Sequence, residues 1–256
     1  MAKTRMKKII TAGLLTVEAI YPRIERADSR KTRAAKRRAS SEAQKRMNAV
    51  YSWQKCEWMI AANFRPGDLW ITVTYDDAHL PKSRNEAQLR FKYFLSKLNS
   101  ELRRQGREAV VLWNAEHKHQ HESFWEDRRW HHHFFLNAGG EDFEMIRRLW
   151  IYGSNVEIRV LDLHGEHSYE ALARYMCKEA RDKPGLRCWS YTRNARRPEI
   201  ETFRVESDTT VQAPKGSRVL MNEGGDKPVG WRVVKYLAAG WDRHAKPGAG
   251  RRRRRR

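Results

Sequence analysis

The sequence predicts an α+β domain with a mainly antiparallel sheet of about five strands, covered by helices on one side. The expected elements run strand, helix, strand, strand, helix, strand, helix, an order that fits neither a doubly wound parallel sheet nor a helical bundle. A chain of 256 residues with 40% hydrophobic residues is long and apolar enough for one large domain. It contains no apolar run of 18 residues, and its N-terminus lacks a small-residue cleavage site, so we expect neither a membrane span nor an export signal.

The formal net charge of +21 is concentrated at the two ends of the chain. Residues 1–48 hold fourteen Lys and Arg against four Asp and Glu, and residues 241–256 hold eight against one. We therefore expect a partly disordered basic arm over 1–48, a folded domain over 49–240 and a disordered Arg-rich tail over 241–256. Such arms favour a polyanion, usually nucleic acid, because each neutralised phosphate releases counterions.

The three cysteines, Cys56, Cys177 and Cys188, are an odd number without CxxC spacing. This pattern argues against both a disulfide framework and a four-cysteine zinc site. We therefore expect a cytoplasmic protein.

The first half of the domain is predicted to contain a helix, a strand and a second helix. Apolar residues recur at helical spacing over residues 41–62, and Pro66-Gly67-Asp68 follows as a turn. Residues 69–75 are β-branched and aromatic with Thr72 and Thr74 alternating, which predicts a strand. Residues 84–105 predict an amphipathic helix, whose buried side is expected to contain Leu89, Tyr93, Phe94, Leu98 and Leu102.

Two strands that we expect to pair antiparallel follow, at residues 109–116 and 130–137, joined by the polar stretch 117–128. The pattern then predicts a helix over 141–150, a strand over 155–161 and a helix over 167–182. An extension of the domain begins at about residue 186, where residues 186–211 are less periodic. It ends with 229–237, a strand or a short helix.

The strand over 130–137 begins with consecutive histidines that suggest a metal site. Because side chains alternate along a strand, His131 and His133 project from the same face. Glu116, at the end of the neighbouring strand, is the best third ligand, and its oxygen would suit Mg²⁺ or Mn²⁺. The alternative is a strand end that is merely rich in histidine.

A second set of histidines alternates in the preceding stretch, at His117, His119 and His121. No apolar alternation surrounds them, so we interpret them as loop residues. A structural zinc site in that loop remains an alternative.

Tyr175 and Lys178, one helical turn apart, are the candidate nucleophile and its partner. A phenol has an ordinary pKa near 10 and is a poor nucleophile at neutral pH, so the lysine would stabilise the phenolate or the phosphate that it attacks. A core tyrosine beside a solvated lysine is the more common outcome of a YxxK pattern.

Taken in order, WITVTY, the strand that ends in Glu116, HHHFFL and YMCK resemble the three motifs of the HUH endonuclease superfamily. The resemblance is to the replication-initiator branch, in which the histidine strand precedes the tyrosine helix. The segments SEAQKRMN, NFRPGDLWITVTYDDAHLP and WSYTRNARRPE are similar to rolling-circle replication-associated proteins of the filamentous-phage initiator type. This resemblance covers roughly residues 25–200 and implies an HUH-endonuclease, ferredoxin-like fold.

The resemblance also implies roles for individual residues. The metal ligands would be Glu116, His131 and His133, the nucleophile Tyr175 and its partner Lys178. The sequence departs from the family pattern in two ways. First, the residue between the paired histidines is itself a histidine, His132, which leaves open which histidines are the metal ligands. Second, Tyr169 stands six positions before Tyr175 and so does not form the close pair of two-tyrosine members, which predicts single-tyrosine chemistry.

The implied reaction is site-specific nicking and joining of single-stranded DNA at a replication origin, through a 5′-phosphotyrosine intermediate. A metal at the ligands would polarise the scissile phosphate. The chain has no GxxxxGK motif, so we expect no helicase domain in it and host helicase and polymerase as partners in the bacterial cytoplasm.

The residues that we expect to bind DNA are Arg193, Arg196, Arg197, Arg37 and Arg38. Two other functions remain open: a non-catalytic protein that binds single-stranded nucleic acid, and a transposase of the HUH type.

Overall fold

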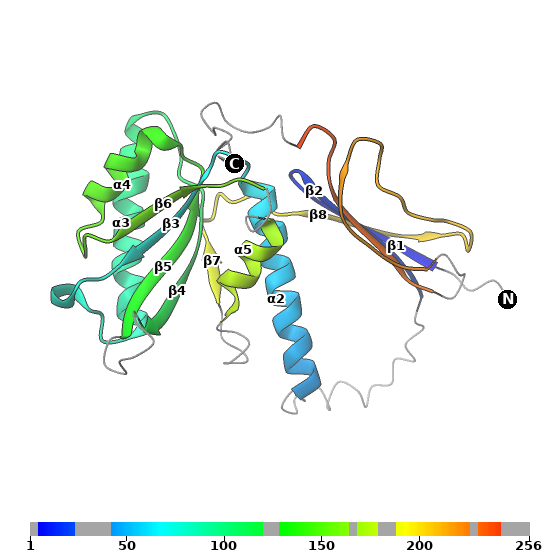
Figure 1. Ribbon diagram of the computed structural model, residues 1–256, viewed down its shortest axis with the longest axis horizontal. Helices are drawn as coiled ribbons and strands as arrows, with labels where there is room; N and C mark the ends of the chain where they lie inside the picture. The colour runs from blue at the N-terminus through cyan, green and yellow to red at the C-terminus, as the bar shows by residue number, and fades with distance from the viewer. Residues whose placement is uncertain are drawn as a thin grey trace, which may run out of the picture.

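The structure, a computed structural model, describes residues 5–23, 42–119, 128–163, 168–178, 188–225 and 230–241. Two five-stranded antiparallel sheets and four α-helices make up this part of the chain, which confirms the α+β class (Figure 1). The first, here called the histidine sheet, has the order β6 (Val156–Val160), β3 (Leu69–Thr74), β5 (Arg128–Leu136), β4 (Val111–His119) and β7 (Trp189–Tyr191). The second sheet has the order β8 (Glu199–Val205), β1 (Arg5–Ala12), β2 (Leu15–Pro22), β10 (Arg232–Leu237) and β9 (Arg218–Gly224).

The helices form two layers, one on either side of the histidine sheet (Figure 1). The outer layer consists of α3 (Arg84–Arg104) and α4 (Phe143–Leu149), and the layer between the two sheets consists of α2 (Glu42–Asn63) and α5 (Tyr169–Met176). Helices therefore cover both faces of this sheet rather than one. The reason is visible in β5, where Phe134 and Phe135 point to opposite faces and are both fully buried.

The outer core lies between α3 and the histidine sheet. It is formed by buried residues of the helix, including Phe91, Phe94 and Leu98, packed against Ile71 and Phe134. Leu89 and Tyr93, which the sequence placed on the buried side, are 58% and 49% exposed. The buried side of α3 instead contains Ala87 and Phe91 and is therefore rotated relative to the prediction.

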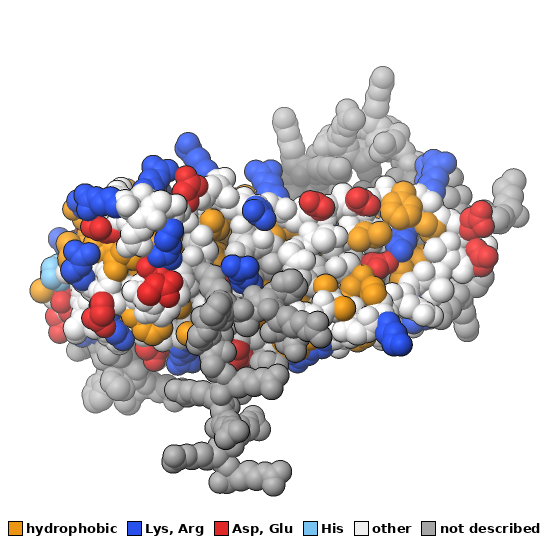
Figure 2. Space-filling view, turned by 90° about the horizontal axis from the view of Figure 1, so that it is seen from above, with side chains coloured by type: hydrophobic (Ala, Val, Ile, Leu, Met, Phe, Trp, Pro, Cys, Tyr) orange, Lys and Arg blue, Asp and Glu red, His pale blue; other side chains and the backbone are white. Residues whose placement is uncertain are grey.

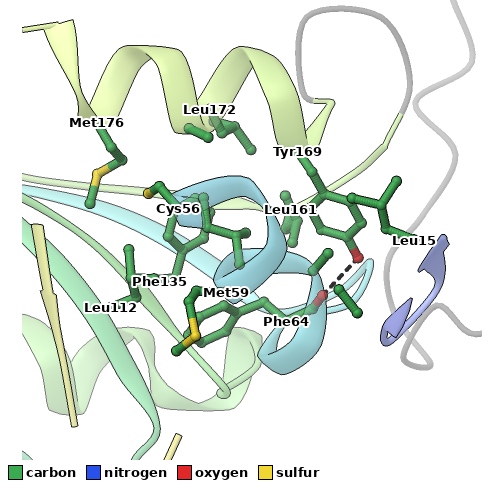
Figure 3. Packing of buried hydrophobic residues seen from close by; sticks show 14 of the residues in the cluster. Leu15, Cys56, Met59, Phe64, Leu112, Phe135, Leu161, Tyr169, Leu172 and Met176 are labelled. Atoms are coloured by element: carbon green, nitrogen blue, oxygen red, sulfur yellow. Dashed lines mark hydrogen bonds between the residues drawn. The ribbon is translucent and has the colours of Figure 1, made fainter. Parts of the chain in front are cut away.

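The central core lies between the two sheets and joins them (Figure 3). Met59 from α2, Phe135 from β5 and Met176 from α5 meet there with Leu15 from the second sheet. At one end Tyr169 donates a hydrogen bond from its hydroxyl to the carbonyl of Phe64 at 2.7 Å. Because the buried residues of α5 pack in this core, its last turn has a defined position over the histidine sheet.

The N-terminal segment differs from the predicted basic arm, because residues 5–22 form the hairpin of β1 and β2. Gly13 makes its tight turn with a φ of 57°, and a Cβ there would lie 2.2 Å from the carbonyl oxygen of Ala61 in α2. The basic residues are accommodated within the fold. Arg5 is 1% exposed and donates to the carbonyls of Ser207, Thr209 and Gly230.

A buried ion group connects the second sheet to the two inner helices. Lys235 of β10 is 5% exposed, and its ammonium lies 2.8 Å from the carboxylate of Glu57 in α2 and 2.5 Å from that of Glu170 in α5. This group ties the helix that contains Tyr175 to a strand more than fifty residues later in the chain.

The remaining predicted elements are confirmed with shifted ends, and the largest shift is in α5, which ends at Met176 rather than at residue 182. β10 resolves the choice between strand and helix over 229–237 in favour of a strand. Residues 24–41 of the predicted arm and residues 242–256 of the predicted tail lie outside the described residues. In the described ranges, no helix combines the length and the hydropathy needed to cross a membrane. Figure 2 shows hydrophobic side chains over the second sheet, on the right. The exposed large hydrophobic residues of its strands include Ile200, Phe203 and Val219, and Trp231, just before β10, is exposed as well.

Candidate active site

The pairing of three strands brings the predicted ligands together on the inner face of the histidine sheet. Along the central strand β5, His131 lies directly between Thr74 of β3 and Glu116 of β4. Two residues further, His133 lies between Thr72 and Asn114. Cross-strand partners project from the same face, so both histidines and the glutamate face the layer of α2 and α5.

Glu116 and His133 form the buried centre of this site. Their side chains are only 5% and 7% exposed, and the carboxylate Oε2 lies 3.0 Å from Nε2 of the imidazole. Burial alone would raise the pKa of Glu116, but the hydrogen bonds and positive charge of His133 and Lys178 outweigh it and lower this pKa to about 2. Glu116 is therefore an anion at any pH at which the protein would act.

Tyr175 and Lys178 reach this centre from the end of α5. The Tyr175 hydroxyl lies 3.3 Å from Nε2 of His133, and the side chain is 39% exposed. The Lys178 ammonium lies 2.7 Å from Oε1 of Glu116 and 3.8 Å from the centre of the Tyr175 ring. The positive charge thus lies between the phenol and the carboxylate, where it can stabilise a phenolate or an adjacent phosphate.

Two threonines that the sequence analysis used only as a strand pattern contact the histidines from β3. The hydroxyl of Thr72 lies 2.9 Å from Nδ1 of His133, and that of Thr74 lies 2.8 Å from Nδ1 of His131. The two imidazoles are nearly parallel, with an angle of 14° between their planes. Hydroxyl contacts at Nδ1 orient both rings so that each would bind a ligand through Nε2.

His132 points to the opposite face of the sheet, into the outer core. Its side chain is completely buried, stacks on Phe91 at 4.3 Å and lies within hydrogen-bonding distance of the Tyr75 hydroxyl and the Asn114 carbonyl. Burial lowers its pKa to about 3, so the imidazole is neutral. The open register is therefore resolved in favour of His131 and His133 as the pair on the inner face.

Asn114 is a further residue that the sequence analysis missed. Its amide accepts from the backbone N–H of His133 at 3.2 Å and donates to the carbonyl of Met176 at 3.1 Å. This side chain joins the histidine strand to the turn that follows Tyr175. An isolated Asn in a strand gives no local signal of that role, because its second partner is 62 residues away.

The other predicted residues lie away from this centre or outside the described part of the chain. Arg193, Arg196 and Arg197 follow β7 and are exposed, and the backbone of Arg196 is held by the Asn63 side chain at the end of α2. Arg37 and Arg38 lie outside the described residues, as does His121. His117 and His119 lie in β4 rather than in a loop, and the His117 ring stacks on Trp130 at 4.5 Å.

The side chains of Glu116, His131 and His133 are of the types that bind a divalent metal. In this structure, however, they do not have the arrangement of a metal site. Two imidazoles with oriented Nδ1 atoms and one ionised carboxylate on the same face are ligands that Mn²⁺ or Mg²⁺ accepts. The carboxylate lies directly against His133, and no group of three His, Cys, Asp or Glu in the described ranges has the geometry of a metal site. Binding would therefore require Glu116 to exchange its hydrogen bond with His133 for the metal.

Comparison with known proteins supports the predicted resemblance. Residues 68–181 match the model of a family of replication-associated proteins. This range includes β4, β5, α5 and the residue Lys178 that follows α5, and it therefore contains all five predicted residues of the site. No curated protein and no solved structure gives a significant match.

Proposed function

We propose that this protein initiates rolling-circle replication by nicking and rejoining single-stranded DNA through Tyr175. The observation that carries the proposal is the convergence of a half-exposed phenol, a lysine and a carboxylate-bound imidazole on one sheet face. The family match over the same residues supports a role in replication. The cellular setting that we propose is the cytoplasm of a bacterial host, with its helicase and polymerase as partners.

In the proposed reaction, the Tyr175 oxygen attacks the phosphorus of a single-stranded DNA phosphodiester. The bond from phosphorus to the 3′-oxygen breaks, the phosphate stays on the tyrosine as a 5′-phosphotyrosine, and the departing 3′-oxygen takes up one proton in place of the proton lost by the phenol. One phosphodiester replaces another, so a later 3′-hydroxyl can reverse the step and rejoin the strand without a nucleotide cofactor.

The residues around the phenol have distinct roles in this step. Lys178 stabilises the phenolate and the phosphate, since its ammonium already contacts the phenol ring. Glu116, His131 and His133 would hold Mg²⁺ or Mn²⁺, which supplies Lewis-acid polarisation of the phosphate. The threonine contacts keep both imidazoles oriented, and Asn114 keeps Tyr175 above them.

The test is covalent attachment of a labelled single-stranded oligonucleotide drawn from the DNA that flanks the gene. We expect a denaturation-resistant adduct with the wild-type protein in Mn²⁺, none in EDTA and none with Tyr175→Phe. An adduct that persists with Tyr175→Phe would show that another residue is the nucleophile. Tyr169→Phe is the matched control, because the Tyr169 hydroxyl is buried in the central core and bonds the Phe64 carbonyl.

A purely binding protein is the alternative that this assay separates most clearly. Such a protein would retain the oligonucleotide in EDTA and form no adduct with any metal. A transposase of the same superfamily would form the adduct as well, and only the DNA sequence that it cleaves would distinguish it.

A further inference from the structure

A cavity of about 370 Å³ lies between α2 and β7, beside the candidate active site and distinct from it. Its lining comes from about two turns of α2 and from the strand β7 with the residue before it, and consists of Asn48, Tyr51, Ser52, Lys55, Cys188, Trp189 and Tyr191. Its volume is in the lower part of the range of small-ligand pockets, about 300–1,000 Å³. It is therefore large enough for one flat ring system.

Three aromatic side chains, Tyr51, Trp189 and Tyr191, line this cavity. Trp189 and Tyr191 are neighbours on the inner face of β7, with ring centres 5.8 Å apart and planes inclined by 33°. Tyr51 faces them from α2 and is 49% exposed. The polar groups Asn48, Ser52 and Lys55 complete the lining.

Two contacts connect residues that line the cavity to residues next to the candidate active site. Trp189 pairs in register with Asn114, the residue that holds His133 and the turn after Tyr175. On the other wall, the Ser52 hydroxyl hydrogen-bonds the thiol of Cys177, two residues after Tyr175. A strand with its phosphate at Tyr175 would therefore have this cavity nearby.

The charges along α2 and β7 favour a polyanion here. Lys55 is exposed at the cavity, and Arg193, Arg196 and Arg197 are exposed where β7 ends. The Asn63 contact with Arg196 places these arginines at the end of α2, which is eight residues or about 12 Å beyond Lys55. Aromatic stacking surfaces beside a row of cations are the features with which proteins bind single-stranded nucleic acid.

We propose that this cavity receives an unpaired base of the single-stranded DNA adjacent to the scissile phosphate, stacked between Tyr51 and Trp189 with Lys55 on the backbone. This inference rests on the proposed function for its substrate, and it assigns to α2 a role in holding DNA. Because stacking is tolerant of sequence, the cavity would position the strand rather than select the origin.

The test measures binding without chemistry, in the Tyr175→Phe background and in EDTA. Fluorescence anisotropy compares labelled oligothymidylate with an oligonucleotide of equal length and charge that contains only abasic sites. The cavity variants are Tyr51→Ala and Lys55→Ala. Their matched controls are Tyr93→Ala, an equally exposed helical tyrosine on α3, and its neighbour Lys97→Ala.

We expect Tyr51→Ala to weaken oligothymidylate binding by about 5- to 100-fold and to leave abasic binding unchanged. Lys55→Ala should weaken both ligands alike, and the α3 variants should change neither by more than about twofold. The proposal is overturned if Tyr51→Ala binds oligothymidylate as tightly as Tyr93→Ala does, or if it loses the abasic ligand to the same extent. A failed adduct assay would refute the nicking reaction without altering this result, so the two proposals fail separately.

Discussion

Replacement of Lys235 by Met tests how the second sheet supports the helix that contains the nucleophile. In the variant, Glu57 would remain 1% exposed without the ammonium that neutralises it, although the methionine fills a similar volume. Removal of one member of a buried ion pair costs about 3–5 kcal/mol, because the other charge stays buried and uncompensated. We expect a loss of that size at neutral pH, which is a large part of the total stability of a domain.

The pH dependence of this loss follows from the two carboxylates. Burial raises the pKa of Glu57 above its ordinary value of 4.5, even though Lys235 attracts the charge. Burial also acts to raise the pKa of Glu170, but Lys235 and Arg174 outweigh it and lower that pKa. Without Lys235 the pKa of Glu57 rises further. A carboxyl whose pKa is higher in the folded state favours folding below 4.5 and loses that contribution as pH increases, so the penalty is largest at neutral pH and shrinks on acidification.

Urea unfolding followed by circular dichroism at several pH values between 5 and 8 measures both the loss of stability and its pH dependence. The free energy of unfolding needs to be resolved to about 1 kcal/mol. The double variant Lys235→Met/Glu57→Met should recover most of the loss, since it leaves no buried charge at Glu57. Arg147→Met is the surface control, because its partner Glu144 is 88% exposed and the pair should contribute less than about 1 kcal/mol. A loss below about 1 kcal/mol with Lys235→Met, or one independent of pH, would refute this reasoning.

Three further predictions concern the site itself. His132→Ala should lower the free energy of unfolding in urea by about 2–5 kcal/mol, as large-to-small core substitutions do. His131→Ala should lower it by less than about 1 kcal/mol and should abolish Mn²⁺ binding in calorimetry. Equal stability losses would contradict the assignment of the two histidines to opposite faces. Thr72→Val should weaken Mn²⁺ binding by about 10- to 100-fold, with the exposed Thr202→Val as an unaffected control, and an unchanged affinity would rule out the orienting role. Asn114→Ala should retain Mn²⁺ binding but slow adduct formation by up to about 100-fold in a single-turnover assay, a result that a wild-type rate would exclude.

Local patterns in the sequence were sufficient for the strands and helices around the site. Alternation with a period of two predicted that His131 and His133 share a face, and this holds because strand geometry alone decides it. The order of the histidine strand and the YxxK helix indicated the family resemblance, which the match over residues 68–181 supports. Each motif consists of residues close together in the chain, and the order of the motifs can be read directly from the sequence.

The tertiary structure alone decided which distant residues meet. Tyr175 reaches His133 because the central core fixes α5 over that face, whereas Glu116 was already expected beside His131 from the predicted pairing of their strands. The sequence analysis did not predict the second sheet, apart from the strand or helix over 229–237, because β1 and β2 pair with β8 and β10 at the far end of the chain. The basic residues of β1 suggested a solvated arm in the sequence, because the carbonyl groups that accept hydrogen bonds from Arg5 lie more than two hundred residues later in the chain. Pairing over such separations depends on complementary surfaces rather than on periodicity, and for that reason no local pattern contains it.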